Sequence, residues 1–220
     1  MQSEMQSEVY EGQFGNFTIE PEDRREVVIY RAGLAIAAIS FAVGTLLTLQ
    51  WGAENWAMQA ASVCYVVLWV ALGVSLSYIH IYLRALHRAI QVFWAVGGVA
   101  SLGIALTQPG PLALTVYQQP LTILGIGFTF ASLTGIFFKE AVCFNRFETK
   151  LLAPIVPLLL LGHLVGFLPA SVEAGLLAAW AILFGVFALR KGVQPIPPDI
   201  GDKSVFAYLA QQREQQSSAV

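Results

Sequence analysis

The stretch AMQAASVCYVVLWVALGVSLSYI, residues 57–79, contains no Asp, Glu, Lys or Arg. A second stretch without these residue types runs from Ala32 to Leu49. A helix that crosses the hydrocarbon of a bilayer, roughly 30 Å thick, needs about 20 predominantly apolar residues. Both stretches therefore predict transmembrane helices.

The composition of the 220-residue chain agrees with a membrane protein. Hydrophobic residues make up 56% and charged residues 12%, whereas ordinary globular chains carry about 25% charged residues. The mean hydropathy is +0.65. These values exclude a disordered chain. The chain has 12 Lys and Arg and 14 Asp and Glu, which excludes a basic nucleic-acid-binding protein. It has two cysteines, which excludes a disulfide-stapled secreted module.

Six apolar runs are separated by polar breaks or by breaks that contain Pro and Gly. The predicted fold class is therefore all-α, a polytopic membrane protein with six transmembrane helices. The predicted spans are 31–49, 56–79, 89–106, 120–138, 151–168 and 172–189. They form a transmembrane domain of residues 21–191, between a polar N-terminal tail, 1–20, and a Pro-rich linker with a short cytoplasmic tail, 192–220.

The basic residues predict the orientation, because Lys and Arg next to membrane helices resist translocation. With six spans, all twelve lie on one side, in residues 1–30, 80–88, 139–150 and 190–220 and at the helix entrance Arg31. The loops on the other side, 50–55, 107–119 and 169–171, contain none. Both termini are therefore expected on the cytoplasmic or stromal side.

Polar residues of several reactive types gather at the predicted cytoplasmic helix ends. If the chain stays helical there, His80, Arg84 and His87 share one face. The other cytoplasmic turn adds Lys139, Glu140, Cys143 and Glu148. These side chains could be membrane-edge anchors with paired charges, ligands of a pigment or cofactor, or catalytic groups. No HExxH or CxxC pattern is present, so neither a metal site nor a catalytic residue is predicted.

His163 lies inside the fifth predicted span. An ionisable residue in hydrocarbon is costly and by default suggests a function. Three interpretations remain open: a hydrogen bond to a neighbouring helix, axial ligation of a tetrapyrrole, and a transport or proton role. Gly162 and Gly166 have the GxxxG spacing that favours close helix packing, so the fifth helix is expected inside the bundle.

The string TGIFFKEAVCF, from Thr134 to Phe144, and the span that follows it resemble a known family. The chain is similar to the DUF2301 family of uncharacterised integral membrane proteins, found mainly in cyanobacteria. The resemblance covers about residues 20–192. It implies a multi-pass protein of a cyanobacterial membrane, thylakoid or plasma membrane, and it supplies no established activity and no site residues.

The function expected from these observations is that of a non-enzymatic accessory or assembly factor for pigment–protein complexes of the photosynthetic membrane. Its partners would be the lipid bilayer and photosystem subunits or membrane-insertion machinery, not nucleic acid. Chlorophyll, haem or carotenoid are the cofactors considered, with His163, His80 and His87 as candidate ligands. The alternatives are a small-solute transporter or channel, and a membrane redox or cofactor-binding protein.

Overall fold

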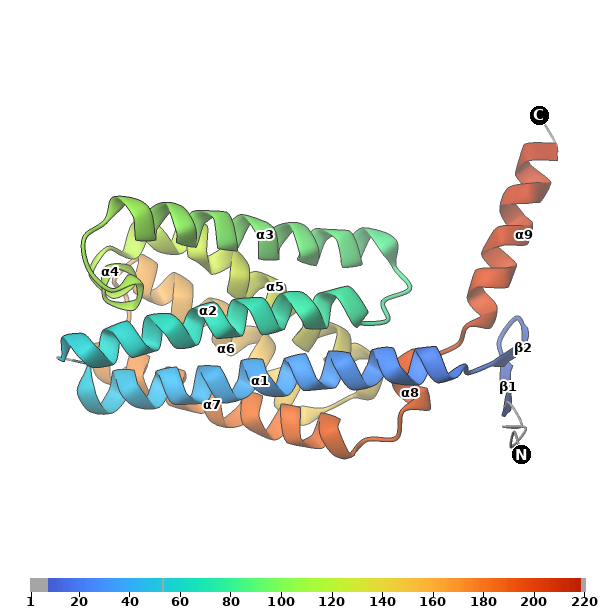
Figure 1. Cartoon of the computed structure of the whole chain (residues 1–220), viewed down its shortest axis with the longest axis horizontal. Coiled ribbons are helices and arrows are strands. Elements are labelled where there is room, and N and C mark those ends of the chain that lie inside the picture. The colour runs from blue at the N-terminus through green and yellow to red at the C-terminus, as the bar shows by residue number, and fades with distance from the viewer. Residues whose placement is uncertain (1–7, 53, 219–220) are drawn as a thin grey trace, which may run out of the picture.

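The computed structural model describes residues 8–52 and 54–218. Within these residues, six helices are long and apolar enough to cross a membrane, and they lie side by side in one bundle (Figure 1). Their bounds are α1 Pro21–Trp51, α2 Asn55–Tyr78, α3 Arg84–Thr107, α5 Ile123–Phe144, α6 Phe147–Leu164 and α7 Ala170–Val193. The predicted all-α fold with six candidate spans is confirmed.

The two ends of the bundle carry different short elements (Figure 1). At the outer end, as we call it, the chain passes from α3 to α5 through α4, Leu112–Gln118, and the 3-10 helix η1, Pro120–Thr122. At the opposite, inner end lie a hairpin of β1, Val9–Gly12, and β2, Gly15–Thr18, and the helices α8, Pro197–Ile200, and α9, Ser204–Ser218.

Part of the predicted polar N-terminal tail is folded. β1 and β2 pair in antiparallel register, with Val9 opposite Thr18, and Gly15 supplies a positive φ of 132° in the turn. Below the hairpin, α1 begins at Pro21, where the main-chain N–H of Glu20 donates to the Asp23 carboxylate at 2.8 Å. This bond satisfies a donor that the start of the helix leaves without a partner.

The helix α6 ends at Leu164, before the predicted Leu168. The N–H of Phe167 donates to the Gly162 carbonyl at 3.0 Å, the N–H of Gly166 donates to the His163 carbonyl at 3.1 Å, and Gly166 has a φ of 67°. This is the Schellman arrangement that terminates helices. A Cβ on Gly166 would meet nothing within 4 Å, and one on Gly162 would meet Leu168. Gly162 and Gly166 thus shape the turn that follows α6. The prediction that Gly166 packs against a second helix is wrong.

Helix contacts close a ring in the order α2, α1, α7, α6, α5, α3 and back to α2. The inner half of the ring is filled by fully buried side chains, including Leu34, Leu72, Leu133, Phe137 and Phe184. The Phe137 and Phe184 rings meet edge to face at 5.3 Å. Large apolar side chains on the outside are exposed, such as Val99 on α3, as expected for a surface that faces lipid.

Two tryptophans join α2 to α3. Trp69 Nε1 donates to the Trp94 carbonyl at 3.0 Å, and Trp94 Nε1 donates to the Trp69 carbonyl at 2.8 Å. The rings stack with centroids 4.5 Å apart. The Trp69 ring also covers Gly98 of α3, and the Trp94 ring covers Gly73 of α2. A Cβ on either glycine would lie 2.4 Å from the nearest indole atom. Both tryptophans are therefore packing residues.

Gly33 sets the distance between α1 and α2. A Cβ there would lie 2.8 Å from the Ala71 carbonyl oxygen and 2.5 Å from Ser75 Oγ. Ser75 Oγ in turn donates to the Tyr30 carbonyl at 3.0 Å. Close backbone approach of this kind replaces the hydrophobic driving force that helices lack inside lipid.

We predict that Gly33→Ala destabilises the protein by about 1–3 kcal/mol, because the added methyl group forces α1 and α2 apart. The midpoint of thermal unfolding in detergent should fall. Gly185→Ala on α7 is the matched control, since a Cβ there meets nothing within 4 Å. Equal midpoints for the two variants would contradict the packing role of Gly33.

The orientation expected from the basic residues can be tested at Cys143, which is exposed at the inner end. In a Cys64→Ser background, a membrane-impermeant maleimide should label Cys143 in inverted vesicles and not in right-side-out membranes. A Gln118→Cys variant without the native cysteines reports the outer end, because Gln118 is exposed at the end of α4. Labelling of Cys143 from the outside would reverse the orientation.

Candidate functional site

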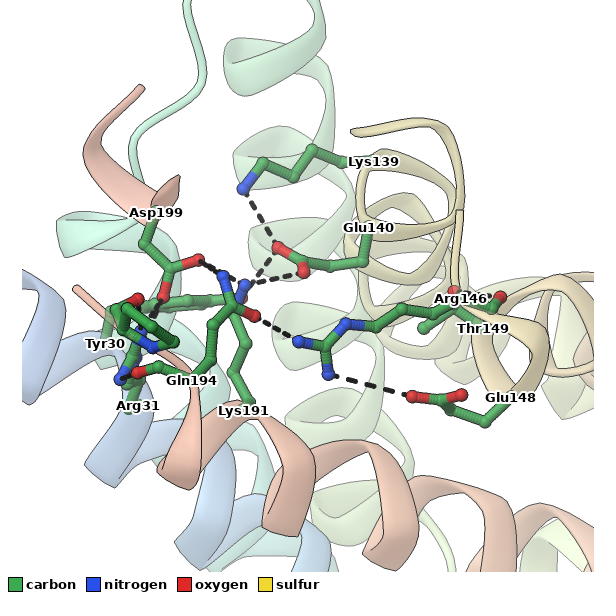
Figure 2. A network of polar contacts seen from close by, with 11 residues as sticks. Tyr30, Arg31, Lys139, Glu140, Arg146, Glu148, Thr149, Lys191, Gln194 and Asp199 are labelled. Atoms are coloured by element: carbon green, nitrogen blue, oxygen red, sulfur yellow. Dashed lines mark hydrogen bonds and ion pairs between the residues drawn. The ribbon is translucent and has the colours of Figure 1, made fainter. Parts of the chain in front are cut away.

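A buried network of charged side chains lies at the inner end (Figure 2). At its centre the Lys191 ammonium of α7 lies between two carboxylates, Glu140 of α5 and Asp199 of α8. Lys191 Nζ is 2.6 Å from Glu140 Oε2 and also donates to Asp199 Oδ1. All three residues are buried. A buried charge is costly unless opposite charges and hydrogen bonds compensate for lost water, and the two carboxylates supply that compensation for Lys191.

Arg31 of α1 binds Asp199 from another side. Its Nε lies 2.8 Å and its Nη2 2.7 Å from Asp199 Oδ2. The same guanidinium donates to the main-chain carbonyls of Gln194 at 2.6 Å and Pro195 at 2.9 Å. Tyr82 of the α2–α3 loop donates to the carbonyl of Ile200. These bonds hold the Pro-rich linker and α8 against the bundle.

The second oxygen of Glu140 is also occupied. Lys139 Nζ donates to Glu140 Oε1 at 2.9 Å, and the Tyr30 hydroxyl lies 3.5 Å from the same oxygen. Lys191 Nζ lies 4.3 Å from the centroid of the Phe144 ring, a cation–π contact that adds to its stabilisation. The carboxylate of Glu140 is thus surrounded by donors from three helices.

A second branch of the network joins α6, α7 and the turn between α5 and α6 through Glu148. Arg190 Nη1 donates to Glu148 Oε2 at 2.7 Å, and Arg146 Nη1 lies 3.8 Å from Glu148 Oε1. Arg146 also donates to the side-chain oxygen of Gln194. Glu148 stands in the first turn of α6, where a negative charge interacts favourably with the helix dipole. The carboxylates are paired with the protein's own cations, so the network holds the inner ends of these helices together.

The predicted cytoplasmic cluster is only partly assembled. Lys139, Glu140 and Glu148 meet in the network, whereas Arg84 and Cys143 are exposed and lie outside it.

His80, Arg84 and His87 do not share a helical face, because the chain between Tyr78 and Arg84 is not helical. His80 Nε2 lies 3.2 Å from Glu26 Oε2, and His87 Nε2 lies 2.7 Å from the Leu76 carbonyl. Burial lowers the pKa of His80 below its ordinary value, although the carboxylates of Glu26 and Asp23 act in the opposite direction. The prediction of one shared face is wrong.

Sequence analysis missed Arg31, Lys191 and Asp199 as members of a site. It used the two cations only to assign the topology and left Asp199 in the tail. The Pro197-Pro198-Asp199 string shortly after Lys191 is a weak signal, since a Pro-rich segment with one acid close to a basic helix end can fold back onto it. Their convergence depends on contacts between distant segments.

An apolar cavity of about 510 Å³ occupies the outer half of the ring. Its walls come from α1, α2, α4, α5, α6 and α7, and they include the aromatic side chains of Phe41, Tyr65, Phe130 and Trp180. Cavities of roughly 300–1,000 Å³ lined by apolar groups with a few polar ones are typical of small-molecule sites. The mouth lies at the outer end, where Leu49 and Tyr117 are exposed.

His163 stands at this mouth, in the last turn of α6, because α6 ends at Leu164. His163 Nδ1 lies 2.7 Å from Glu173 Oε1, and His163 Nε2 lies 3.1 Å from the Tyr117 carbonyl oxygen. The Tyr117 carbonyl can only accept, so Nε2 donates to it, and Nδ1 is paired with the Glu173 carboxyl group. The ring also stacks on Tyr117 with centroids 5.2 Å apart. Axial ligation by His163 would require one of these bonds to break.

Two buried polar atoms in the cavity wall have no hydrogen-bond partner among the described residues. They are Trp180 Nε1 and Thr45 Oγ1. A buried polar atom without a partner is uncommon and calls for an explanation. Elsewhere, no three His, Cys, Asp or Glu residues within 8–52 and 54–218 converge as metal ligands would.

A family model described as an uncharacterised integral membrane protein, DUF2301, matches residues 74–208. The chain belongs to this family. No curated protein and no solved structure matches it. The matched region contains Glu140, His163, Lys191 and Asp199, whereas Arg31 lies outside it. Membership establishes an integral multi-pass membrane protein in contact with the lipid bilayer.

We predict that Lys191→Met destabilises the protein by about 1–3 kcal/mol, because Glu140 and Asp199 stay buried and each loses a charged hydrogen-bond donor, while Lys139 and Arg31 remain as their cations. The unfolding midpoint in detergent should fall more than for Lys203→Met, whose partly exposed pair with Asp23 is worth at most about 1 kcal/mol. Equal midpoints for the two variants would contradict the central role of Lys191.

Proposed function

We propose that this protein is a non-enzymatic accessory protein of its membrane that holds an apolar molecule in the outer cavity. The observation that carries the proposal is the cavity itself, about 510 Å³ with predominantly apolar walls. Inside a bundle of membrane helices, such a space suits a molecule that is already dissolved in lipid. A water-soluble metabolite would find few polar groups to replace its hydration.

The closed inner half favours retention over passage. Below the cavity, Leu34, Leu133 and Phe137 are fully buried members of one hydrophobic cluster. Beneath them, the network around Lys191 joins four helices. A transporter would have to open both layers, and a pathway for polar solutes lined by ionisable groups is the usual requirement. The alternative of a small-solute transporter or channel is therefore less well supported.

The inner end offers a surface for partner proteins, as an accessory role requires. The hairpin and the start of α9 contact each other: the N–H of Gln13 donates to the Asp202 carboxylate at 2.7 Å, and the rings of Phe14 and Tyr208 stack at 4.1 Å. α9 projects from the bundle (Figure 1). A short polar helix presented in this way suits binding to another protein.

The more specific proposal is that the partners are pigment–protein complexes of a photosynthetic membrane, which the protein would help to assemble or keep stable. A carotenoid or another membrane pigment is an apolar molecule of the kind the cavity can hold. Ligation of a chlorophyll or haem by His163 is less well supported, because both of its ring nitrogens are hydrogen-bonded. The same observation weakens the alternative of a redox protein with a histidine-bound cofactor.

The test is to purify the protein from its native membrane in mild detergent and to identify co-purifying apolar molecules by mass spectrometry and absorption. One such molecule should be present in stoichiometric amount. We predict that Ala174→Phe, which fills the cavity wall, lowers its occupancy about tenfold or more, since overpacking costs about 1–3 kcal/mol.

The matched control is Ala105→Phe, which places the same side chain on the exposed surface of α3. Its ligand content should equal that of the natural protein. A natural protein with no stoichiometric apolar molecule, or equal occupancy in both variants, would overturn the proposal. Co-purification of photosystem subunits that is lost on deleting residues 204–218 would support the more specific role.

A further inference from the structure

Trp180 lies deep in the wall of the outer cavity. It lies about 15 Å along α7 from Ala170 at the mouth, at 1.5 Å rise per residue. Its exposed fraction is 1%, and its Nε1 has no hydrogen-bond partner in the described structure. An indole N–H can only donate. The cavity wall therefore contains a buried donor that lacks an acceptor.

Thr45 supplies a second such group on the neighbouring helix α1. Its hydroxyl is buried and without a partner, whereas Thr48, on the same helix, donates to the Gly44 carbonyl at 2.9 Å. Thr45 lies one helical turn beyond Phe41, whose ring is 4.4 Å from that of Trp180. Two donors from different helices thus border the same part of the cavity.

The walls between these donors are aromatic. The Phe130 ring meets Trp180 edge to face at 5.1 Å, and Tyr65 lies 6.0 Å from Phe130. The Tyr65 hydroxyl is already engaged by Ser101 and Thr129, at 2.6 and 2.8 Å, so Tyr65 offers its ring only. Aromatic walls of this kind favour a flat unsaturated ring.

We infer that the cavity takes up a prenylated quinone, ring first, with its carbonyl oxygens accepting hydrogen bonds from Trp180 Nε1 and Thr45 Oγ1. A quinone combines a flat ring, two carbonyl oxygens and an apolar tail, which matches the aromatic floor, the two unpaired donors and the apolar path to the mouth. A phospholipid would enter with its acyl chains, since its ester carbonyls stay beside the headgroup, and would leave both donors unpaired.

The polar mouth is consistent with this direction. The His163–Glu173 pair stands at the membrane interface, where it can border the end of the tail without accepting or donating further hydrogen bonds through the imidazole. The inference rests on the proposed function, because it names the class of molecule that the same cavity would hold.

The test uses the purified full-length protein in detergent and a decyl-substituted benzoquinone as the probe. Affinity is measured by calorimetry, and the infrared carbonyl band of the bound probe is recorded. Decylbenzene, which has no carbonyl, is the control ligand. Binding to the natural protein should shift the carbonyl band to lower wavenumber, and decylbenzene should bind markedly more weakly.

Trp180→Phe keeps an aromatic ring and removes the donor. We predict about five- to tenfold weaker binding of the quinone and a smaller band shift, as expected for the loss of one buried hydrogen bond. Trp94→Phe is the matched control, because Trp94 lies outside the cavity lining and its N–H bonds to Trp69. Its quinone affinity should be unchanged. Thr45→Val provides an independent variant if Trp180→Phe does not fold.

Equal quinone affinity in the natural protein and in both Trp180→Phe and Thr45→Val would overturn the inference, as would equal binding of decylbenzene. A stoichiometric native ligand without a ring carbonyl, such as a phospholipid, would overturn it while leaving the proposed function intact. If Ala174→Phe changes neither the occupancy of the native ligand nor the affinity of the probe, both proposals fail.

Discussion

The inner end depends on the ion pairs that the buried Lys191 ammonium forms with Glu140 and Asp199. Both carboxylates are buried, so each needs cations and hydrogen-bond donors to replace the water that it has lost. Because Arg31 shares Asp199, the α8 segment is tied to α1 and α7 together. These shared charges connect α1, α5, α7 and α8 at the inner end.

With the inner end closed by charges and by the packed Leu and Phe side chains above it, the outer half can remain hollow. There the helices are joined by hydrogen bonds that leave the centre free, such as those of Tyr65 to Ser101 and Thr129. An apolar space is less unfavourable at the outer end than beside the charged network, because lipid-soluble molecules can fill it. The charged network around Lys191 and the cavity are thus separated along the bundle axis.

The interpretation of the sequence was most accurate where the signal is one-dimensional. Runs of apolar residues predicted the six helices, and the position of Lys139, Glu140 and Glu148 between two predicted spans placed them at one end. The role of His163 could not be predicted in the same way. Its depth depends on where α6 stops, and Gly166 fits a packing motif and a helix-ending turn equally well in sequence; the positive φ in the folded chain distinguishes them.

The sequence by itself determined the fold class, the number of candidate spans and the segregation of positive charge, because each follows from the hydropathy and charge of neighbouring residues. Only the tertiary structure decided which charges neutralise one another, and that Trp180 and Thr45 border one cavity. Those relations join residues far apart in the chain, and the helix contacts that bring them together arise from packing and desolvation. These forces act on the assembled surface and leave no periodic pattern in the sequence.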